Sequence, residues 1–101
     1  FCGGFTEAKK VCCYADVYDI CIQAHVWGGP VATAASLHLE TAIPNFLIHE
    51  HHTYAIKDWN RELCLQDPQP VDGFFQVSEE PGLGIELNDA VVMKSPHVVI
   101  K

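Results

Sequence analysis

The chain has 101 residues, 49% of them hydrophobic, and its 6 Lys and Arg residues against 13 Asp and Glu residues give a formal net charge of −7. This composition is sufficient for one small packed domain, and the scattered basic residues argue against a nucleic-acid partner, which needs basic clusters. No apolar run approaches the roughly 18 residues of a membrane span and no signal peptide is visible, so no membrane association is expected.

The 5 cysteines form no CxxC motif, and Cys12 and Cys13 are adjacent. This odd number and this spacing fit neither a disulfide framework nor a zinc knuckle. Free thiols in helical or apolar segments behave as small hydrophobes. The simplest interpretation is a reducing, cytoplasmic setting.

The first predicted element is a helix from Glu7 to about Tyr18, with Thr6 as its N-cap. Lysine and aspartate side chains form its solvent-exposed face, and apolar residues recur with helical spacing on the other face. The apolar face comprises Ala8, Val11, Cys12, Ala15 and Tyr18.

Two short apolar runs each end on an ionisable residue. Residues 20–24 lead into His25, and residues 46–49 lead into Glu50. Both runs predict strands covered on both faces. Chemistry in parallel α/β folds collects at the carboxyl ends of strands, so His25 and Glu50 form a candidate acid–base site. Alternation of side chains groups Cys21, Gln23 and His25 on one face of the first strand, and Phe46, Ile48 and Glu50 on one face of the second.

The segment between the two runs predicts a single helix over residues 31–43. Pro30 suits its first turn, and Pro44 ends it. Trp27 lies in the loop before this helix, where it either walls a pocket or fills an ordinary packing role. The order is therefore strand, helix, strand, with a candidate acid or base at the far end of both strands.

Residues 53–101 are predicted to form an arm that packs against another part of the structure. The expected elements are a short helix over residues 55–63, an extended linker over 66–73, a strand over 74–77, a turn-rich loop over 80–84 and a short helix from the cap Asn88 to Val92 or Met93. Two parallel strands leave exposed edges, and a closed barrel needs eight strand–helix units and about 250 residues. The chain is therefore expected to be part of a larger assembly.

The tract from His49 to His52 also invites a metal-site interpretation. Neighbouring residues of a strand point to opposite faces, so His49 with His51, or Glu50 with His52, supplies two ligands at most. The sequence places no third ligand. A polar loop start is the preferred interpretation.

An ordered set of motifs gives the chain a family resemblance. The set comprises Gly3-Gly4-Phe5-Thr6-Glu7-Ala8, His25 with Gly29-Pro30, Ala34-Ala35-Ser36-Leu37-His38, Pro44-Asn45-Phe46, Glu50, and Pro81-Gly82-Leu83-Gly84-Ile85-Glu86-Leu87. It resembles the carboxyl-terminal part of acid-sugar dehydratases of the mandelate racemase branch of the enolase superfamily, with galactonate dehydratase as the nearest type. Any one motif is weak, and the ordered set from Gly3 to about Leu87 is fairly specific.

The resemblance implies an α/β fold: a TIM-type (β/α)8 barrel with an α+β capping domain, of which this chain supplies only part. Residues 1–52 would be the barrel segment with helix six, strand seven, helix seven and strand eight. Residues 53–101 would be a carboxyl-terminal arm that returns to the barrel and the capping domain. The change in character near His52 agrees with this division.

Family chemistry, as the resemblance implies it, is that of a lyase. A proton α to a sugar-acid carboxylate is abstracted, Mg²⁺ stabilises the enediolate, and the β-hydroxyl is lost to give a 2-keto-3-deoxy acid. His25 matches the strand-seven histidine that acts as general base or acid. Glu50 matches the strand-eight glutamate that binds the substrate carboxylate and helps to hold the enediolate. Trp27 is a further candidate for substrate contact.

Several family features fall outside this chain. The carboxylate ligands of Mg²⁺, the aspartate that orients the strand-seven histidine and a second base all belong to earlier parts of the barrel. The expected partners are therefore the amino-terminal remainder of the enzyme and a sugar-acid substrate, with a homo-oligomer for the complete enzyme and no activity for the isolated chain. Racemisation or epimerisation in the same superfamily, and a non-catalytic truncated fragment, stay open as alternatives.

Overall fold

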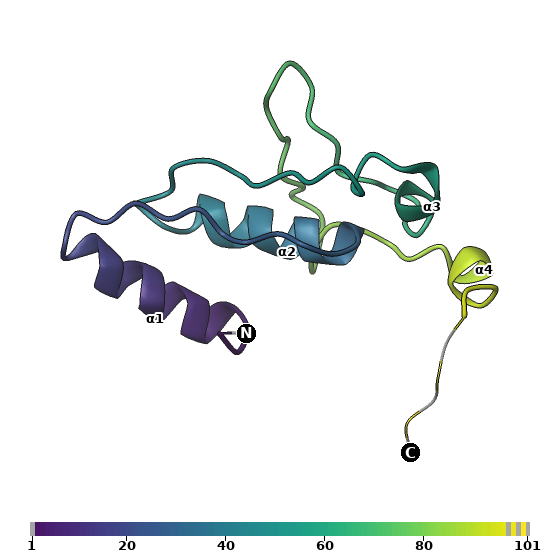
Figure 1. Cartoon of the computed structure of the whole chain (residues 1–101), viewed down its shortest axis with the longest axis horizontal. Coiled ribbons are helices and arrows are strands. Elements are labelled where there is room, and N and C mark those ends of the chain that lie inside the picture. Colours follow the sequence, from purple (N-terminus) through teal and green to yellow (C-terminus); the bar gives the residue numbers. More distant parts are fainter. Residues whose placement is uncertain (1, 97, 99, 101) are drawn as a thin grey trace.

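The computed structural model describes residues 2–96, 98 and 100. Its helices, in chain order, are α1 (Phe5–Asp16), α2 (Pro30–Thr41), α3 (Asp58–Arg61) and α4 (Asp89–Val92). The two long helices lie in the first half of the chain, and two extended segments run alongside α2 (Figure 1). None of the described helices has the length and apolarity needed to cross a membrane.

The core is small and lies between α1, α2 and the segments that follow them. Its side chains are mostly short, and only a few exceed alanine or cysteine in size. The buried hydrophobic residues are Ala8, Cys12, Val26, Ala34, Leu37, Ile43, Ala55 and Cys64. All five cysteines are free, and burial raises the pKa of the Cys12 and Cys64 thiols above the ordinary value.

The two predicted strands are reduced to one parallel bridge between Ile22 and Phe46. The Ile22 N–H donates to the Asn45 carbonyl at 2.7 Å, and the Leu47 N–H donates to the Ile22 carbonyl at 2.9 Å. Regular strands over 20–24 and 46–50 were a wrong prediction for the described residues. Parallel strands occur almost only in sheets buried on both faces, and in the part of the chain that the structure describes no further strand extends this pair, which agrees with pairing that ends after one bridge.

The prediction that these runs are covered on both faces is also wrong. Leu47 and Ile48 point to opposite faces of the extended segment and are 62% and 56% exposed, so both faces of the second run are open at these residues. Asn45 anchors the bridge from the other direction, because its Nδ2 donates to the carbonyls of Cys12 and Ile20, both at 2.9 Å. One amide therefore ties the end of α1 to both apolar runs.

Helix α1 begins earlier than predicted, and its N-cap is Gly4 rather than Thr6. Gly4 has a φ of 88°, a conformation that favours glycine, and its carbonyl accepts the Ala8 N–H at 2.9 Å. Tyr18, predicted to lie on the apolar face, falls beyond the helix and is 70% exposed. The helix buries only part of its expected face because little of the chain packs against it.

Helix α2 agrees with its predicted bounds to within two residues. Pro30 occupies its first turn, as predicted from the fixed φ of proline. Two polar side chains, Thr33 and Glu40, are buried on this helix together with Ala34 and Leu37. Helix α2 thus carries a buried carboxylate among apolar residues.

The arm beyond His52 has short elements joined by turns. The predicted helix over residues 55–63 contains the four residues of α3, and the predicted strand over 74–77 is wrong, since Phe74 makes only an antiparallel bridge to Val71. A second antiparallel bridge joins Cys64 to Leu87. Asn88 precedes α4 as predicted, but it caps through its carbonyl, without a side-chain hydrogen bond.

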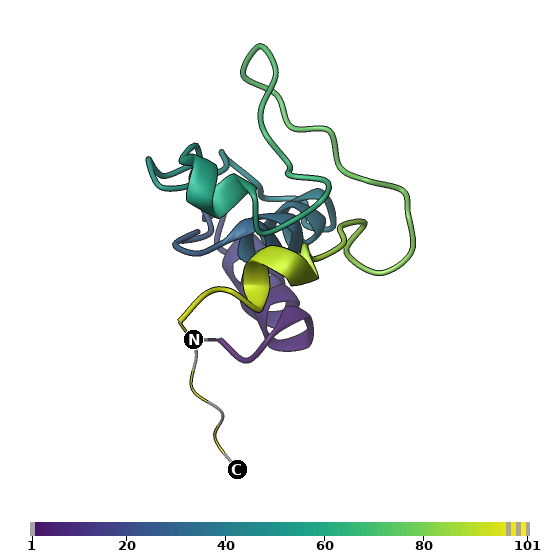
Figure 2. The same ribbon diagram turned by 90° about the vertical axis from the view of Figure 1, so that its right-hand side faces the viewer.

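The arm loops away from α2 and then returns to it (Figures 1 and 2). On its return the Leu83 carbonyl lies 3.2 Å from His38 Nε2 on α2. Gly84, with a φ of 66°, allows this return, because a Cβ there would clash with the Ser78 side chain.

Candidate functional site

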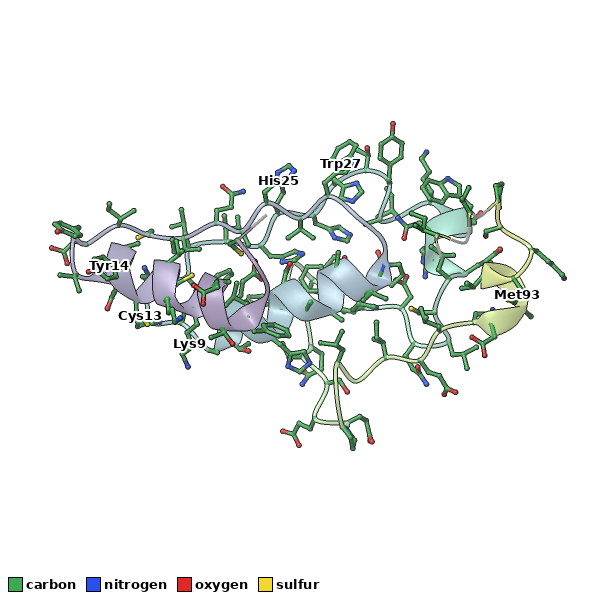
Figure 3. All side chains as sticks on the ribbon, turned by 90° about the horizontal axis from the view of Figure 1, so that it is seen from below. Lys9, Cys13, Tyr14, His25, Trp27 and Met93 are labelled. Carbon is green, nitrogen blue, oxygen red and sulfur yellow. The ribbon has the colours of Figure 1, made fainter. Side chains whose placement is uncertain are left out.

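His25 and Glu50 lie together where the two extended segments leave their bridge. His25 Nδ1 is 3.3 Å from Glu50 Oε2, and the two side chains are 77% and 30% exposed. His25 and Trp27 project to the same side of their segment, away from α2 (Figure 3). The structure thus brings together the pair of residues that the sequence singled out, on an open side of the molecule.

The regular alternation of side chains along two paired strands does not explain the contact between His25 and Glu50. With Ile22 opposite Phe46, a regular parallel ladder would place His25 beside His49 and Val26 beside Glu50. Among the described residues, the ladder hydrogen bonds between the two segments end at Leu47. Beyond that point the backbones are free of the ladder, and Glu50 reaches the side on which His25 lies.

An aromatic cluster continues the site along its loop. The rings of Trp27 and His52 stack with centroids 4.8 Å apart, and Tyr54 meets Trp27 edge-on at 5.3 Å. The Tyr54 N–H donates to His52 Nδ1 at 3.1 Å, and His52 Nε2 lies 3.3 Å from the Gly28 nitrogen and 3.2 Å from the Gly28 carbonyl oxygen. Trp27 itself is 63% exposed, so its ring is held yet accessible.

A second His–Glu pair lies behind the first and is buried. His49 Nδ1 is 2.7 Å from Oε2 of Glu40 on α2, and the side chains are 7% and 3% exposed. Burial raises the pKa of Glu40, and the hydrogen bond and charge of His49 partly oppose that rise. This pair couples the last turn of α2 to the residue immediately before Glu50.

His51 shares the buried side with His49. The rings of His49 and His51 both meet the edge or face of Phe75 from the arm, at centroid distances of 4.7 and 5.2 Å. Burial lowers the pKa of His51, and a hydrogen bond with Gln69 opposes this in part. The arm therefore packs directly on the segment that carries Glu50.

The tract from His49 to His52 does not gather around one point. His49 turns to Glu40, Glu50 to His25, and His52 to Gly28. Across the part of the chain that the structure describes, no three His, Cys, Asp or Glu side chains form a cluster able to hold a metal ion. The residues present here therefore do not fit a resident Mg²⁺ site.

The sequence interpretation missed Glu40. The predicted helix over residues 31–43 was given no role for Glu40. The signal was available in the spacing, since Glu40 follows Leu37 by three positions and Thr33 by seven, which places all three on one helix face. Its partner His49 was considered only as a metal ligand.

A cavity of about 710 Å³ lies between α2 and the arm, bordered by Leu37, His38, Gln66, Leu83 and Glu86 among others. Neither His25 nor Glu50 lines it. The chemistry of an imidazole beside a carboxylate belongs instead to the open side. With Nδ1 directed to Glu50, the Nε2 of His25 is available to exchange a proton with a bound molecule.

Comparison with known proteins places this geometry in context. Residues 1–91 match the family model described as enolase C-terminal domain-like. The chain is 38% identical over 90 residues to a D-xylonate dehydratase of Haloferax volcanii, covering 88% of this chain and 22% of that protein. It is 34% identical over 96 residues to the D-galactonate dehydratase family member RspA of Pantoea ananatis, covering 93% of this chain and 22% of that protein.

Solved structures agree. A Salmonella Typhimurium protein provisionally named a dehydratase is 59% identical, with a TM-score of 0.91, over 100% of this chain and 25% of its own. A Jannaschia mandelate racemase/muconate lactonizing enzyme is 31% identical, with a TM-score of 0.84, over 98% of this chain and 25% of its own. The chain thus spans about a quarter or less of the length of these relatives.

Proposed function

The chain belongs to the enolase C-terminal domain-like family, and on this premise we propose that it is the carboxyl-terminal part of a sugar-acid dehydratase. Its matched relatives include proteins named as dehydratases of D-xylonate and of the D-galactonate family. The observation that carries the proposal is the 3.3 Å contact between His25 and Glu50 on the open side. Substrate and activity belong to the complete enzyme.

In the proposed fold, this chain contributes the seventh and eighth strands of a TIM-type barrel, with residues 1–52 as the barrel segment and residues 53–101 as the arm. The parallel bridge between Ile22 and Phe46 supports this arrangement. The barrel would supply the strands that flank this bridge on both sides. His25 and Glu50 would then lie at the carboxyl-terminal mouth, where such barrels carry their chemistry.

In the proposed reaction, the His25 imidazole takes the proton from the carbon α to the substrate carboxylate. Glu50 contacts the substrate carboxylate and holds the resulting enediolate. The imidazolium returns its proton to the β-hydroxyl, which leaves as water, and the enol product tautomerises to a 2-keto-3-deoxy acid. Trp27 forms a wall against which the substrate chain lies. General acid–base transfer of this kind contributes about 10²–10⁴-fold to a rate.

Mg²⁺ would stabilise the enediolate charge in the complete enzyme, with ligands outside this chain. The amino-terminal remainder is accordingly the first partner. Its contact surface would include apolar side chains that this chain leaves open, among them Tyr14 at 75%, Val17 at 78% and Leu47 at 62% exposure. We expect the complete enzyme to be a homo-oligomer in the cytoplasm and the isolated chain to be inactive.

The test uses a barrel chimaera, in which this chain replaces the matching quarter of the Salmonella Typhimurium protein. The chimaera is incubated with Mg²⁺ and a panel of aldonic and aldaric acids, and 2-keto products are measured. We expect dehydration of at least one acid and a loss of about 10²–10⁴-fold in kcat for His25→Asn. Unchanged activity in that variant would contradict the role of His25.

Two other outcomes separate the alternatives. Deuterium incorporation from solvent at the α-carbon without a keto product indicates a racemase or epimerase. A folded chimaera that turns over none of the acids by either assay indicates a non-catalytic fragment. A lysine substitution of the exposed Glu7 serves as a control, because this residue lies on α1 and its carboxylate pairs with Lys10.

A further inference from the structure

We infer that the buried pair of Glu40 and His49 positions Glu50 for its work beside His25. The inference rests on the proposed function, because it assigns this pair a part in the same reaction. Neither side chain reaches the open side, with exposures of 3% and 7%. Both are therefore positioning residues, acting through the backbone of their neighbour.

The hydrogen bond between Glu40 and His49 is short and fixes the position of His49. His49 Nδ1 and Glu40 Oε2 are 2.7 Å apart, the length of a charge-assisted hydrogen bond. Glu40 lies near the end of the twelve-residue helix α2, a rigid element packed on the core. The contact thus fastens the residue immediately before Glu50 to the helix that the extended segments run along.

The other neighbour of Glu50 is held on the same side. His51 packs on Phe75 at 5.2 Å, and His49 packs on the same ring at 4.7 Å. In extended backbone, successive side chains point to opposite faces. Fixing the side chains before and after Glu50 on the buried side therefore directs Glu50 to the open side.

The backbone ladder between the two segments does not direct Glu50 toward His25. The backbone hydrogen bonds between the two segments end at Leu47, and strict alternation from the bridge would carry Glu50 away from His25. The contact between Glu50 and His25 depends on something beyond the ladder, and the fixed position of His49 supplies it. A misplacement of about 1 Å costs roughly 100-fold in a reaction that depends on orientation.

The test compares three variants of the barrel chimaera. Glu40→Met with His49→Phe puts two slightly larger apolar side chains in place of the pair and removes the directional hydrogen bond, and proteins commonly tolerate an apolar replacement of a buried ion pair without loss of stability. Glu40→Gln keeps an acceptor for His49. Glu7→Gln is the matched control, because its bond to Lys10 has the same 2.7 Å length with a side chain 52% exposed.

We expect the double variant to lose about 10- to 100-fold in kcat, with little change in KM and no fall in melting temperature. In its crystal structure, the Glu50 carboxylate should move beyond 3.3 Å from His25 Nδ1. The single variant Glu40→Gln should retain most of the kcat of the unmodified chimaera, and Glu7→Gln should have the same kcat as the unmodified chimaera. A pair with only a structural role would alter the melting temperature and leave kcat and the distance unchanged.

An unchanged kcat together with an unmoved Glu50 in the double variant overturns the inference. If the unmodified chimaera dehydrates none of the acids, the proposed function fails, and the crystal-structure distance alone decides the inference. In that case a displaced Glu50 supports the positioning role, and a retained 3.3 Å contact overturns it.

Discussion

The open side and the buried side of one short tract carry the same two residue types in opposite surroundings. On the open side, His25 meets Glu50 at 3.3 Å with the imidazole 77% exposed. On the buried side, His49 meets Glu40 at 2.7 Å with both side chains at 7% exposure or less. The shorter contact is the one that solvent cannot reach, and the looser contact is the one that a substrate can reach.

This difference separates two tasks. A pair that exchanges protons with a substrate must be accessible and able to adjust, whereas a pair that fixes the backbone benefits from burial and a short bond. Substitutions on the open side should therefore change kinetics without changing stability. Substitutions on the buried side should act through the position of Glu50 or through the pH dependence of stability.

The largest expected effect comes from Glu50→Gln in the barrel chimaera. Removing a group that stabilises a developing negative charge costs about 10²–10³-fold in kcat. The side chain is partly exposed, so the melting temperature should stay within about 2 °C, the shift of a small change in stability. Steady-state kinetics and a thermal melt measure the two quantities. A large fall in melting temperature with an intact kcat would remove the distinction between the two sides.

A smaller effect is expected for Trp27→Ala. The exposed ring is held by stacking on His52 at 4.8 Å and offers a preformed wall to the substrate. Its loss should raise KM about tenfold, equivalent to about 1.4 kcal/mol of binding, with kcat retained. Kinetics on the best acid of the panel check this. If KM is unaltered while the melting temperature falls, Trp27 serves packing alone.

The smallest effect concerns pH and the buried side. Burial lowers the pKa of His51 below its ordinary value of 6.5. Below pH 6.5 the His51 imidazole binds a proton in the unfolded chain but stays neutral to a lower pH in the folded chain. Stability associated with His51 is therefore fully present above about pH 6.5 and is lost as the pH falls below that value. The melting temperature of the chimaera should therefore drop between about pH 7.5 and about pH 5.5.

His51→Gln should weaken this dependence, because the titrating group is gone. Its kcat at neutral pH should change less than that of Glu50→Gln. Melts of both proteins across the same pH range give the comparison. An identical slope in the variant and the parent would mean that His51 takes no part in the pH response.

The sequence predicted those features that depend on local rules. Pro30 and Pro44 bracket α2 because proline fits a first turn and ends a helix, and the observed helix agrees within two residues. The proximity of His25 and Glu50 was foreseeable because both follow segments that a crossover helix makes parallel neighbours. Their roles in catalysis stay predictions.

The features that depend on distant packing were not predictable in this way. The partner of His49 lies nine positions away on another element, and the ring that packs on it comes from the arm. The strand predictions failed for a related reason, since apolar runs form ladders only where neighbouring strands complete them. Thr6 had the right chemistry for a cap, but the permissive backbone of Gly4 set the start of α1.

The parallel bridge has a consequence for where this chain tolerates changes of length. His25 lies three positions after Ile22 and Glu50 lies four positions after Phe46, so the bridge and the buried His49 together set the face on which Glu50 lies. Inserting or deleting a single residue in either interval would turn the following side chains to the opposite face. The exposed turn at Gly73 lies outside both intervals, so extra residues there would leave both of them unchanged.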